Sequence, residues 1–333
     1  MSHLLFYNRE KLKQHTRWRW GEEKFGEKVG VVNNWQELKE RDSKYVIFGI
    51  PEDIGVRANY GRPGAAKAWN ACLDALCNIQ ANSFTQPENV VLLGEIDCKA
   101  AMMDIQSLEV DDPFYTTKIG SLIKEIDEKV TSVVQQIVTL NKIPIIIGGG
   151  HNNSYGNLKG TSLAFDQPIN CVNLDAHSDF RSLEHRHSGN GFSYAFEDGY
   201  LHQYVILGLQ RNYTSEDIFE KMNELKSSIT YLLLESILEG QPTFEEALET
   251  AHKKVAGQPL GIELDLDVIA GMGSSAQSPT GLSLEQARQY IRFFAKRKHL
   301  AYIHLCEGAP AFELHENQVG KALATLISDV ISK

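Results

Sequence analysis

The chain has 333 residues, of which 42% are hydrophobic and 23% are charged, and its formal net charge is −10 at pH 7. This composition is typical of a globular protein and excludes a disordered chain or a long coiled coil. The acidic balance argues against binding to nucleic acid or to an anionic membrane surface, because both attract basic proteins. We expect one large domain over residues 1–333, which is long for a single core but common in α/β proteins.

The N-terminal stretch "MSHLLFYNREKLKQHTRWRW" is too polar for a signal peptide, and no apolar run approaches the roughly 20 residues that a membrane span needs. The five cysteines are scattered and lack the paired spacing of a zinc ribbon or a redox motif, so we expect reduced thiols in the core. These features predict a soluble, cytoplasmic protein. We expect residues 1–42 to form an N-terminal extension that wraps the outside of the fold.

Seven short apolar runs, rich in β-branched residues, predict strands that are buried on both faces. They lie at 44–50, 89–94, 143–150, 169–177, 203–209, 259–267 and 300–308. Apolar residues three and four apart predict helices between them, for example at 117–142, 215–228 and 283–298. This alternation predicts an α/β fold with a doubly wound, largely parallel sheet, and a barrel is the alternative.

Acidic and histidine side chains follow three of these strands. The six residues are His151, Asp175, His177, Asp179, Asp265 and Asp267. In "NLDAHSDFR", Asp175, His177 and Asp179 occupy alternate positions, so these three side chains would project to one side if the strand continued. Because ligands of an open α/β sheet bind beyond the carboxyl ends of its strands, we expect all six side chains to meet there.

Four carboxylates that converge with two imidazoles would repel one another unless a cation lay among them. Oxygen ligands with a minority of nitrogen and no thiolate suit Mn²⁺, with Mg, Fe or Co as alternatives. Six groups are too many for one tetrahedral zinc ion, whereas they suit two ions that share bridging carboxylates and activate a water molecule. Each motif by itself has an ordinary alternative as a cap, a turn or an ion pair.

The segments "GGGHNNSYG", "DAHSDF" and "ELDLDV" resemble the motifs of the arginase (ureohydrolase) family, and the resemblance extends from residue 48 to residue 313. It implies a three-layer α/β/α sandwich around a parallel sheet of about eight strands, with two Mn²⁺ ions per subunit. One ion would take His151, Asp175, Asp179 and Asp265, and the other Asp175, His177, Asp265 and Asp267. Asp175 and Asp265 would then bridge the ions.

Four positions depart from the arginase and agmatinase pattern. They are Gly150 in place of an aspartate, Phe192 in place of a proton-shuttling histidine, and Ala270 and Gly271 in place of Asp-Pro. These departures resemble the formimidoylglutamase branch, which implies hydrolysis of N-formimidoyl-L-glutamate to L-glutamate and formamide. The alternatives are an arginase-like or agmatinase-like hydrolase that releases urea, and a metal-binding member without activity.

The resemblance also implies roles for residues beside the metals. Asp179 would orient the water and pass its proton to the leaving nitrogen, and Glu307 would pair with the substrate amidinium. Arg181 fits a substrate carboxylate geometrically, although a surface arginine is the alternative. Arg57, Arg62 and Asn190 are further candidates for substrate binding. His185 and His187 are proton shuttles or exposed loop residues, and His304 is a core histidine or lies behind the ligands. Relatives often assemble, so a homo-oligomer is left open.

Overall fold

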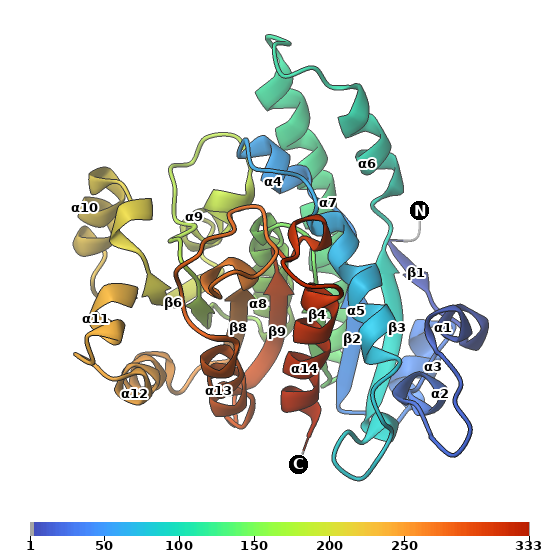
Figure 1. Ribbon diagram of the computed structural model, residues 1–333. Helices are drawn as coiled ribbons and strands as arrows, with labels where there is room; N and C mark the ends of the chain where they lie inside the picture. The colour runs from blue at the N-terminus through green and yellow to red at the C-terminus, as the bar shows by residue number, and fades with distance from the viewer. Residues whose placement is uncertain (1–2, 333) are drawn as a thin grey trace.

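The computed structural model describes residues 3–332, and its centre is one nine-stranded sheet between two layers of helices (Figure 1). The strands are β1 (Leu4–Phe6), β2 (Tyr45–Gly49), β3 (Val90–Ile96), β4 (Ile143–Ile147), β5 (Ile169–Leu174), β6 (Leu201–Leu209), β7 (Ile229–Leu233), β8 (Leu260–Asp265) and β9 (Leu300–Cys306). Their spatial order is β1-β3-β2-β4-β9-β8-β5-β6-β7, and each neighbouring pair is parallel except β1 with β3.

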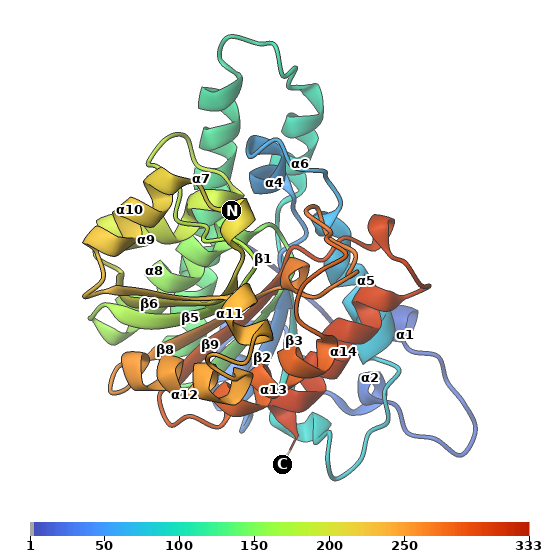
Figure 2. The same cartoon turned by 60° about the vertical axis from the view of Figure 1, so that its left-hand side comes forward.

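Helices cover both faces of the sheet, as Figure 2 shows. One face packs against α5 (Ala68–Leu76), α12 (Phe244–Val255), α13 (Leu284–Ala295) and α14 (Gln318–Ile331). The other packs against α7 (Tyr115–Thr139), α8 (Ser154–Phe165), α9 (Gly191–Glu197) and α10 (Glu216–Glu224). The shorter helices are α1 (Arg9–His15), α2 (Phe25–Lys28), α3 (Trp35–Glu40), α4 (Ile54–Ala58), α6 (Lys99–Asp104) and α11 (Leu234–Leu238).

Alternation along each central strand builds the two cores. In β2, Ile47 joins the core on the α5 and α14 side, whereas Val46 and Phe48 join the core on the α7 side. Both faces of such a strand are therefore apolar, which is why these strands read as continuous hydrophobic runs in the sequence. At the start of α13, Ser283 and Gln286 form the predicted capping box.

The α/β fold with a largely parallel sheet is confirmed, and the open sheet with edges at β1 and β7 rules out the barrel. All seven predicted strands are present, but β1 and β7 were not predicted. β1 shows that the N-terminal segment does more than wrap the fold, since it pairs antiparallel with β3 and extends the sheet. The five cysteines are buried and free, as expected for core thiols. The assignment of one domain to residues 1–333 stays a prediction.

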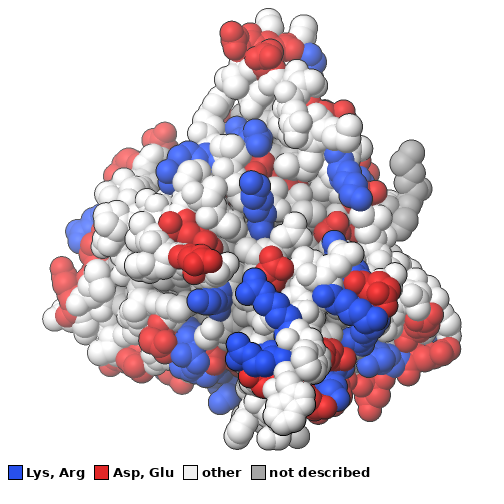
Figure 3. All heavy atoms as spheres, turned by 45° about the vertical axis from the view of Figure 1, so that its right-hand side comes forward, with Lys and Arg blue, Asp and Glu red and all other residues white. Residues whose placement is uncertain are grey.

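A hairpin formed by α6 and α7 projects beyond the carboxyl ends of the strands (Figure 1). In Figure 3, an acidic group marks its tip, where the connecting segment carries Glu109, Asp111 and Asp112. Elsewhere on that face, basic and acidic side chains are interspersed. Among residues 3–332, we find no helix whose length and hydropathy would suit a membrane crossing.

Candidate metal centre

The six predicted ligands lie at or just after the carboxyl ends of β4, β5 and β8, which are in the middle of the sheet with β9 between β4 and β8. The first group surrounds the ring of His151, whose Nδ1 lies 2.8 Å from Asp179 Oδ2, 3.2 Å from Asp175 Oδ2 and 3.3 Å from Asp265 Oδ2. All four side chains are buried or nearly so. The second group forms where His177 Nδ1 lies 3.1 Å from Asp267 Oδ2 and 3.6 Å from Asp175 Oδ1.

The local backbone brings these acids together through turns, and the strand predicted over 169–177 ends earlier, so it does not continue through Asp179. β5 ends at Leu174, and the next carboxylate, Asp175 Oδ1, accepts the His177 N–H at 2.7 Å. Asp265, the last residue of β8, repeats this arrangement by accepting the Asp267 N–H at 2.8 Å. Such Asx turns reverse the chain after one residue. In each case the second carboxylate oxygen is left to face His151.

The charges of this cluster call for a cation. Burial and the neighbouring carboxylates Asp267 and Asp175 raise the pKa of Asp265 well above its usual value, and burial and Asp175 raise that of Asp179. Both ring nitrogens of His151 are buried without a hydrogen-bond partner, and so is Oδ1 of Asp267. Among residues 3–332, the ion-pair partners of these acids are the two histidines, not lysine or arginine.

The donor set fits two divalent ions. Ligand atoms of His151, Asp175, Asp179 and Asp265 lie within 4.8 Å of one another, and so do those of Asp175, His177 and Asp267. Asp175 belongs to both groups, as its predicted bridging role requires. Asp265 belongs only to the first group, so its bridging role stays a prediction.

A cavity of about 310 Å³ opens onto the metal residues, and its size suits a small molecule. Glu307 lines it and is held in place, because its Oε1 accepts the His151 N–H at 2.8 Å and its Oε2 accepts the hydroxyl of Ser275, which lines the same cavity, at 2.9 Å. Burial, together with the charges of Asp267 and Asp179, raises the pKa of Glu307 to about 8. A cationic group bound in the cavity would favour its ionised form.

Arg181 lies at the rim of this cavity with about half of its side chain exposed. Its Nη1 donates to Asn59 Oδ1 at 2.5 Å and its Nη2 to Glu184 Oε1 at 3.0 Å. The guanidinium is therefore oriented by two partners and still accessible from the cavity. Tyr213 also lines the cavity and stacks on the His177 ring, with the ring centroids 5.2 Å apart.

Two residues predicted to bind the substrate, Arg57 and Asn190, do not line this cavity. Arg57 pairs with Asp53 at 2.7 Å and lines a separate cavity of about 280 Å³ under the α6–α7 hairpin. Asn190 is buried, and its Oδ1 accepts from Arg186 Nη1 at 2.7 Å and from the His187 N–H at 3.0 Å. Its side chain therefore holds the loop together. The third candidate, Arg62, stacks on Phe312 and donates to the backbone.

The loop histidines are both engaged. His185 donates from Nε2 to the Ala58 carbonyl at 3.1 Å. His187 is 1% exposed, accepts the Gly189 N–H on Nδ1 at 3.1 Å and contacts Glu184 through Nε2 at 3.0 Å. Burial lowers the pKa of His187 to about 4, so it stays neutral at physiological pH. Neither ring lines the cavity beside the metals.

Packing explains two of the departures in the motifs. A Cβ on Gly150 would lie 2.6 Å from Asn152 Oδ1 and 2.9 Å from a methyl group of Val56, so an aspartate there would require these side chains to shift. Phe192 lies edge-on against His151, with the ring centroids 5.1 Å apart, and stacks on Tyr204 at 4.3 Å. It presents no titratable group to the site.

Sequence reasoning missed the buried acid Glu52. Its Oε1 accepts hydrogen bonds from Asn153 Nδ2 at 2.5 Å and from Gly150 N and Asn152 Nδ2 at 3.2 Å each. Its Oε2 accepts the Ile54 N–H at 2.6 Å. Glu52 thus holds the turn that carries His151. The signal was an acid directly after a buried strand, in "GIPEDIG", which is the same signal that identified the ligands.

The family model of the arginase family matches residues 43–332. Formimidoylglutamases of Geobacillus sp. (strain WCH70) and Fusobacterium nucleatum are 26% and 25% identical to this chain. The alignments cover 90% and 91% of this chain and 86% and 91% of those proteins. A solved formiminoglutamase of Trypanosoma cruzi with Mn²⁺ superposes with a TM-score of 0.73 at 20% identity, covering 93% of this chain and 98% of that one. The formimidoylglutamase of Bacillus subtilis gives 0.75 at 18% identity, covering 95% and 93%. The family match covers most of the sequence, and the sheet topology and the acids at its carboxyl edge are consistent with it. The chain therefore belongs to the arginase family.

Proposed function

We propose that the protein is a dinuclear Mn²⁺ hydrolase that cleaves the C–N bond of N-formimidoyl-L-glutamate to give L-glutamate and formamide. The main support for this proposal is that the side chains of His151, His177 and four aspartates meet beside Glu307. Arg181 lies at the rim of the same cavity. The names of the relatives from Geobacillus and Fusobacterium support the choice of substrate.

When bound, a pair of divalent cations supplies a nucleophilic hydroxide near neutral pH. Asp179 lies at the open side of the first ligand group, with 11% of its side chain exposed to the cavity. It can orient the attacking water and move one of its protons to the departing nitrogen. The amidine carbon gains the water oxygen, its bond to the glutamate nitrogen breaks, and that nitrogen leaves as the amine of L-glutamate.

Glu307 and Arg181 orient the two ends of the substrate. The amidinium would donate to Glu307 through charge-assisted hydrogen bonds, while the backbone of His151 and the Ser275 hydroxyl keep the carboxylate in place. The planar fork of Arg181 would bind a carboxylate of the glutamyl tail. An amidine is cationic and the tail is anionic, so a carboxylate at the base of the cavity and an arginine at its rim match the two charges.

The proposal is tested by assaying metal-depleted protein reconstituted with Mn²⁺ against N-formimidoyl-L-glutamate, L-arginine and agmatine. We expect formamide and L-glutamate in equal amounts from the first substrate, and no urea from the other two. Urea as the main product would show a guanidino hydrolase. Two bound Mn²⁺ ions without turnover of any of these substrates would show a metal-binding member without this activity.

A further inference from the structure

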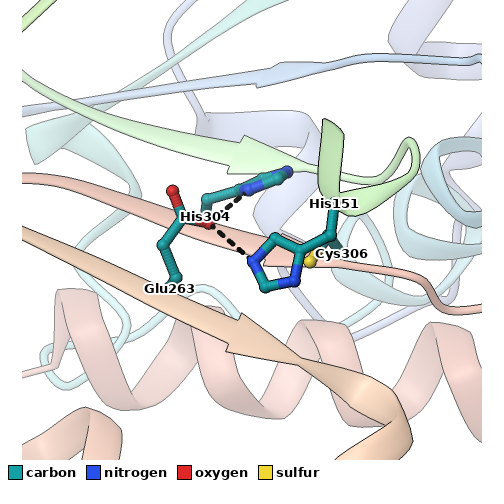
Figure 4. Close-up of side chains that lie close together, drawn as sticks. All are labelled: His151, Glu263, His304 and Cys306. Carbon is teal, nitrogen blue, oxygen red and sulfur yellow. Dashed lines mark hydrogen bonds and ion pairs between the residues drawn. The ribbon is translucent and has the colours of Figure 1, made fainter. Parts of the chain in front are cut away.

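A second group of buried polar side chains lies behind the metal centre. Figure 4 shows Glu263 from β8, His304 and Cys306 from β9, and the ring of His151. All four residues are fully buried. Glu263 and His304 are direct neighbours in the register of β8 with β9. Burying an acid in the middle of a central strand costs free energy unless its oxygens are hydrogen-bonded, so the hydrogen-bond partners of Glu263 indicate its role.

The hydrogen bonds define which atoms donate to Glu263. The Tyr302 hydroxyl donates to Oε1 at 2.8 Å. His304 Nδ1 lies 2.5 Å from Oε2, and its Nε2 lies 3.1 Å from the Gly148 carbonyl. Because a carbonyl only accepts, His304 Nε2 carries a hydrogen. Nδ1 can then donate to the Glu263 carboxylate only if the ring is an imidazolium, so the two residues form an ion pair that fixes the ring. Glu263 is thus held from two sides by residues of β9.

The remaining face of Glu263 points to His151. Oε2 lies 3.5 Å from His151 Nε2, whereas Nδ1 on the other side of the same ring faces Asp175, Asp179 and Asp265. A neutral imidazole that binds a metal through one nitrogen carries its hydrogen on the other, and an acceptor at that hydrogen fixes the tautomer and the ring orientation.

We propose that Glu263 is a positioning residue: its Oε2, which faces the unpartnered Nε2 of His151 at 3.5 Å, takes the Nε2–H when the ring turns the lone pair of Nδ1 to the first metal ion. The proposal rests on the metal pair of the proposed function. It adds a role for a residue behind the ligands, supported by Tyr302 and His304. Sequence reasoning placed His304 in the core or behind the ligands but gave Glu263 no role, because an acid two residues before Asp265 looks like part of the same motif.

The same four residues could be read as a third metal site, since their ligand atoms lie within 4.8 Å of one another. The contacts argue against this reading. Both nitrogens of His304 already have partners, and Cys306 Sγ donates to the Leu264 carbonyl at 3.7 Å. A third ion would have to break these contacts in a fully buried place.

The test is Glu263→Gln, followed by titration of metal-depleted protein with Mn²⁺ alone and by metal analysis. The amide has the shape of the carboxylate, but its NH₂ donates where Oε2 accepted. We expect two ions in the wild type, and for the variant about 10- to 100-fold weaker binding at one of the two sites. Glu95→Gln is the matched control. Glu95 lies on β3 and also accepts a tyrosine hydroxyl, from Tyr7 at 2.5 Å, but β3 is separated by β2 from β4, the nearest strand that leads to a ligand.

A double-mutant cycle separates positioning from a general effect on the fold. In a His151→Asn background, Glu263→Gln should change Mn²⁺ affinity no further, because its effect passes through the His151 ring. An equal loss in both backgrounds, unchanged affinity in Glu263→Gln, or a third wild-type ion that this variant loses would each overturn the proposal. If Glu263→Gln does not fold, Tyr302→Phe, which removes one support of Glu263, must weaken binding at the same site. The readout needs no substrate, so a failed substrate assay leaves this test intact.

Discussion

Arg186 offers the sharpest test of how the loop between β5 and α9 is held. Its side chain is 2% exposed and contacts both carboxylate oxygens of Asp127 on α7, at 3.1 and 3.2 Å. Its Nη2 donates to the Asn152 carbonyl at 2.9 Å, beside the metal ligand His151. One guanidinium thus joins α7, the metal-binding turn and the loop that carries Arg181.

Replacing Arg186 with methionine keeps most of the volume and removes every one of these bonds. Breaking one partner of a buried ion pair costs roughly 3–5 kcal/mol. We expect about 3 kcal/mol, at the lower end of that range, because burial already raises the pKa of Asp127 and the free carboxyl can take up a proton. With 333 residues and about 2.1 cal/mol/K of unfolding entropy per residue, the entropy is about 0.7 kcal/mol/K. The variant should therefore unfold about 4 °C below the wild type.

Scanning calorimetry at pH 7 measures this shift. Arg297→Met is the matched control. Both arginines lie over aromatic rings, Arg186 over Tyr155 and Tyr194 and Arg297 over Phe293, but Arg297 faces its glutamate only at 4.0 Å and lies nearer the surface. It should shift the midpoint by less than about 1 °C, since exposed pairs contribute little. The double variant Arg186→Met/Asp127→Leu should regain most of the loss. Equal midpoints for Arg186→Met and the control would refute the reasoning.

The remaining predictions concern the site and its loop. Asp175→Asn should lose both metal ions and the activity, because Asp175 belongs to both ligand groups; metal analysis of the purified variant measures this. Arg181→Ala should raise KM for N-formimidoyl-L-glutamate about tenfold or more, because a charged hydrogen bond contributes roughly 1.5–3 kcal/mol, and should leave Mn²⁺ content unchanged. His187, whose pKa is lowered to about 4, should make stability fall as pH drops below about 6.5, since the unfolded chain then binds more protons. The loss between pH 7 and pH 5 is about 2 kcal/mol, and His187→Asn should remove it from the thermal unfolding profile.

Each of these has an outcome that contradicts it. A full pair of ions in Asp175→Asn would rule out bridging by that residue. A lower kcat with unchanged KM in Arg181→Ala would move Arg181 from binding to catalysis. Equal pH profiles for the wild type and His187→Asn would mean that His187 is not held neutral in the folded loop.

The kind of chemistry could be predicted from the sequence alone. Ligand type is a local property, so acids and histidines directly after apolar strands, as at His151, Asp175 and Asp265, indicated a hard-metal site without knowledge of the fold. Strand positions were equally local, because central parallel strands are apolar on both faces. β1 and β7 escaped this reasoning because they lie at the edges of the sheet, where burial is less complete.

Which polar side chains face the cavity depends on tertiary contacts that the sequence does not reveal. Arg57 and Arg181 look alike in sequence, but Asp53 holds the first in another cavity while Asn59 and Glu184 hold the second at the rim. The strand end at Leu174, the positive φ of 44° at Asp179 and 60° at Glu307, and the placement of Glu263 behind His151 were equally hidden. Side-chain direction depends on contacts between segments far apart in the chain, such as β8 with β9, and no local pattern encodes those contacts.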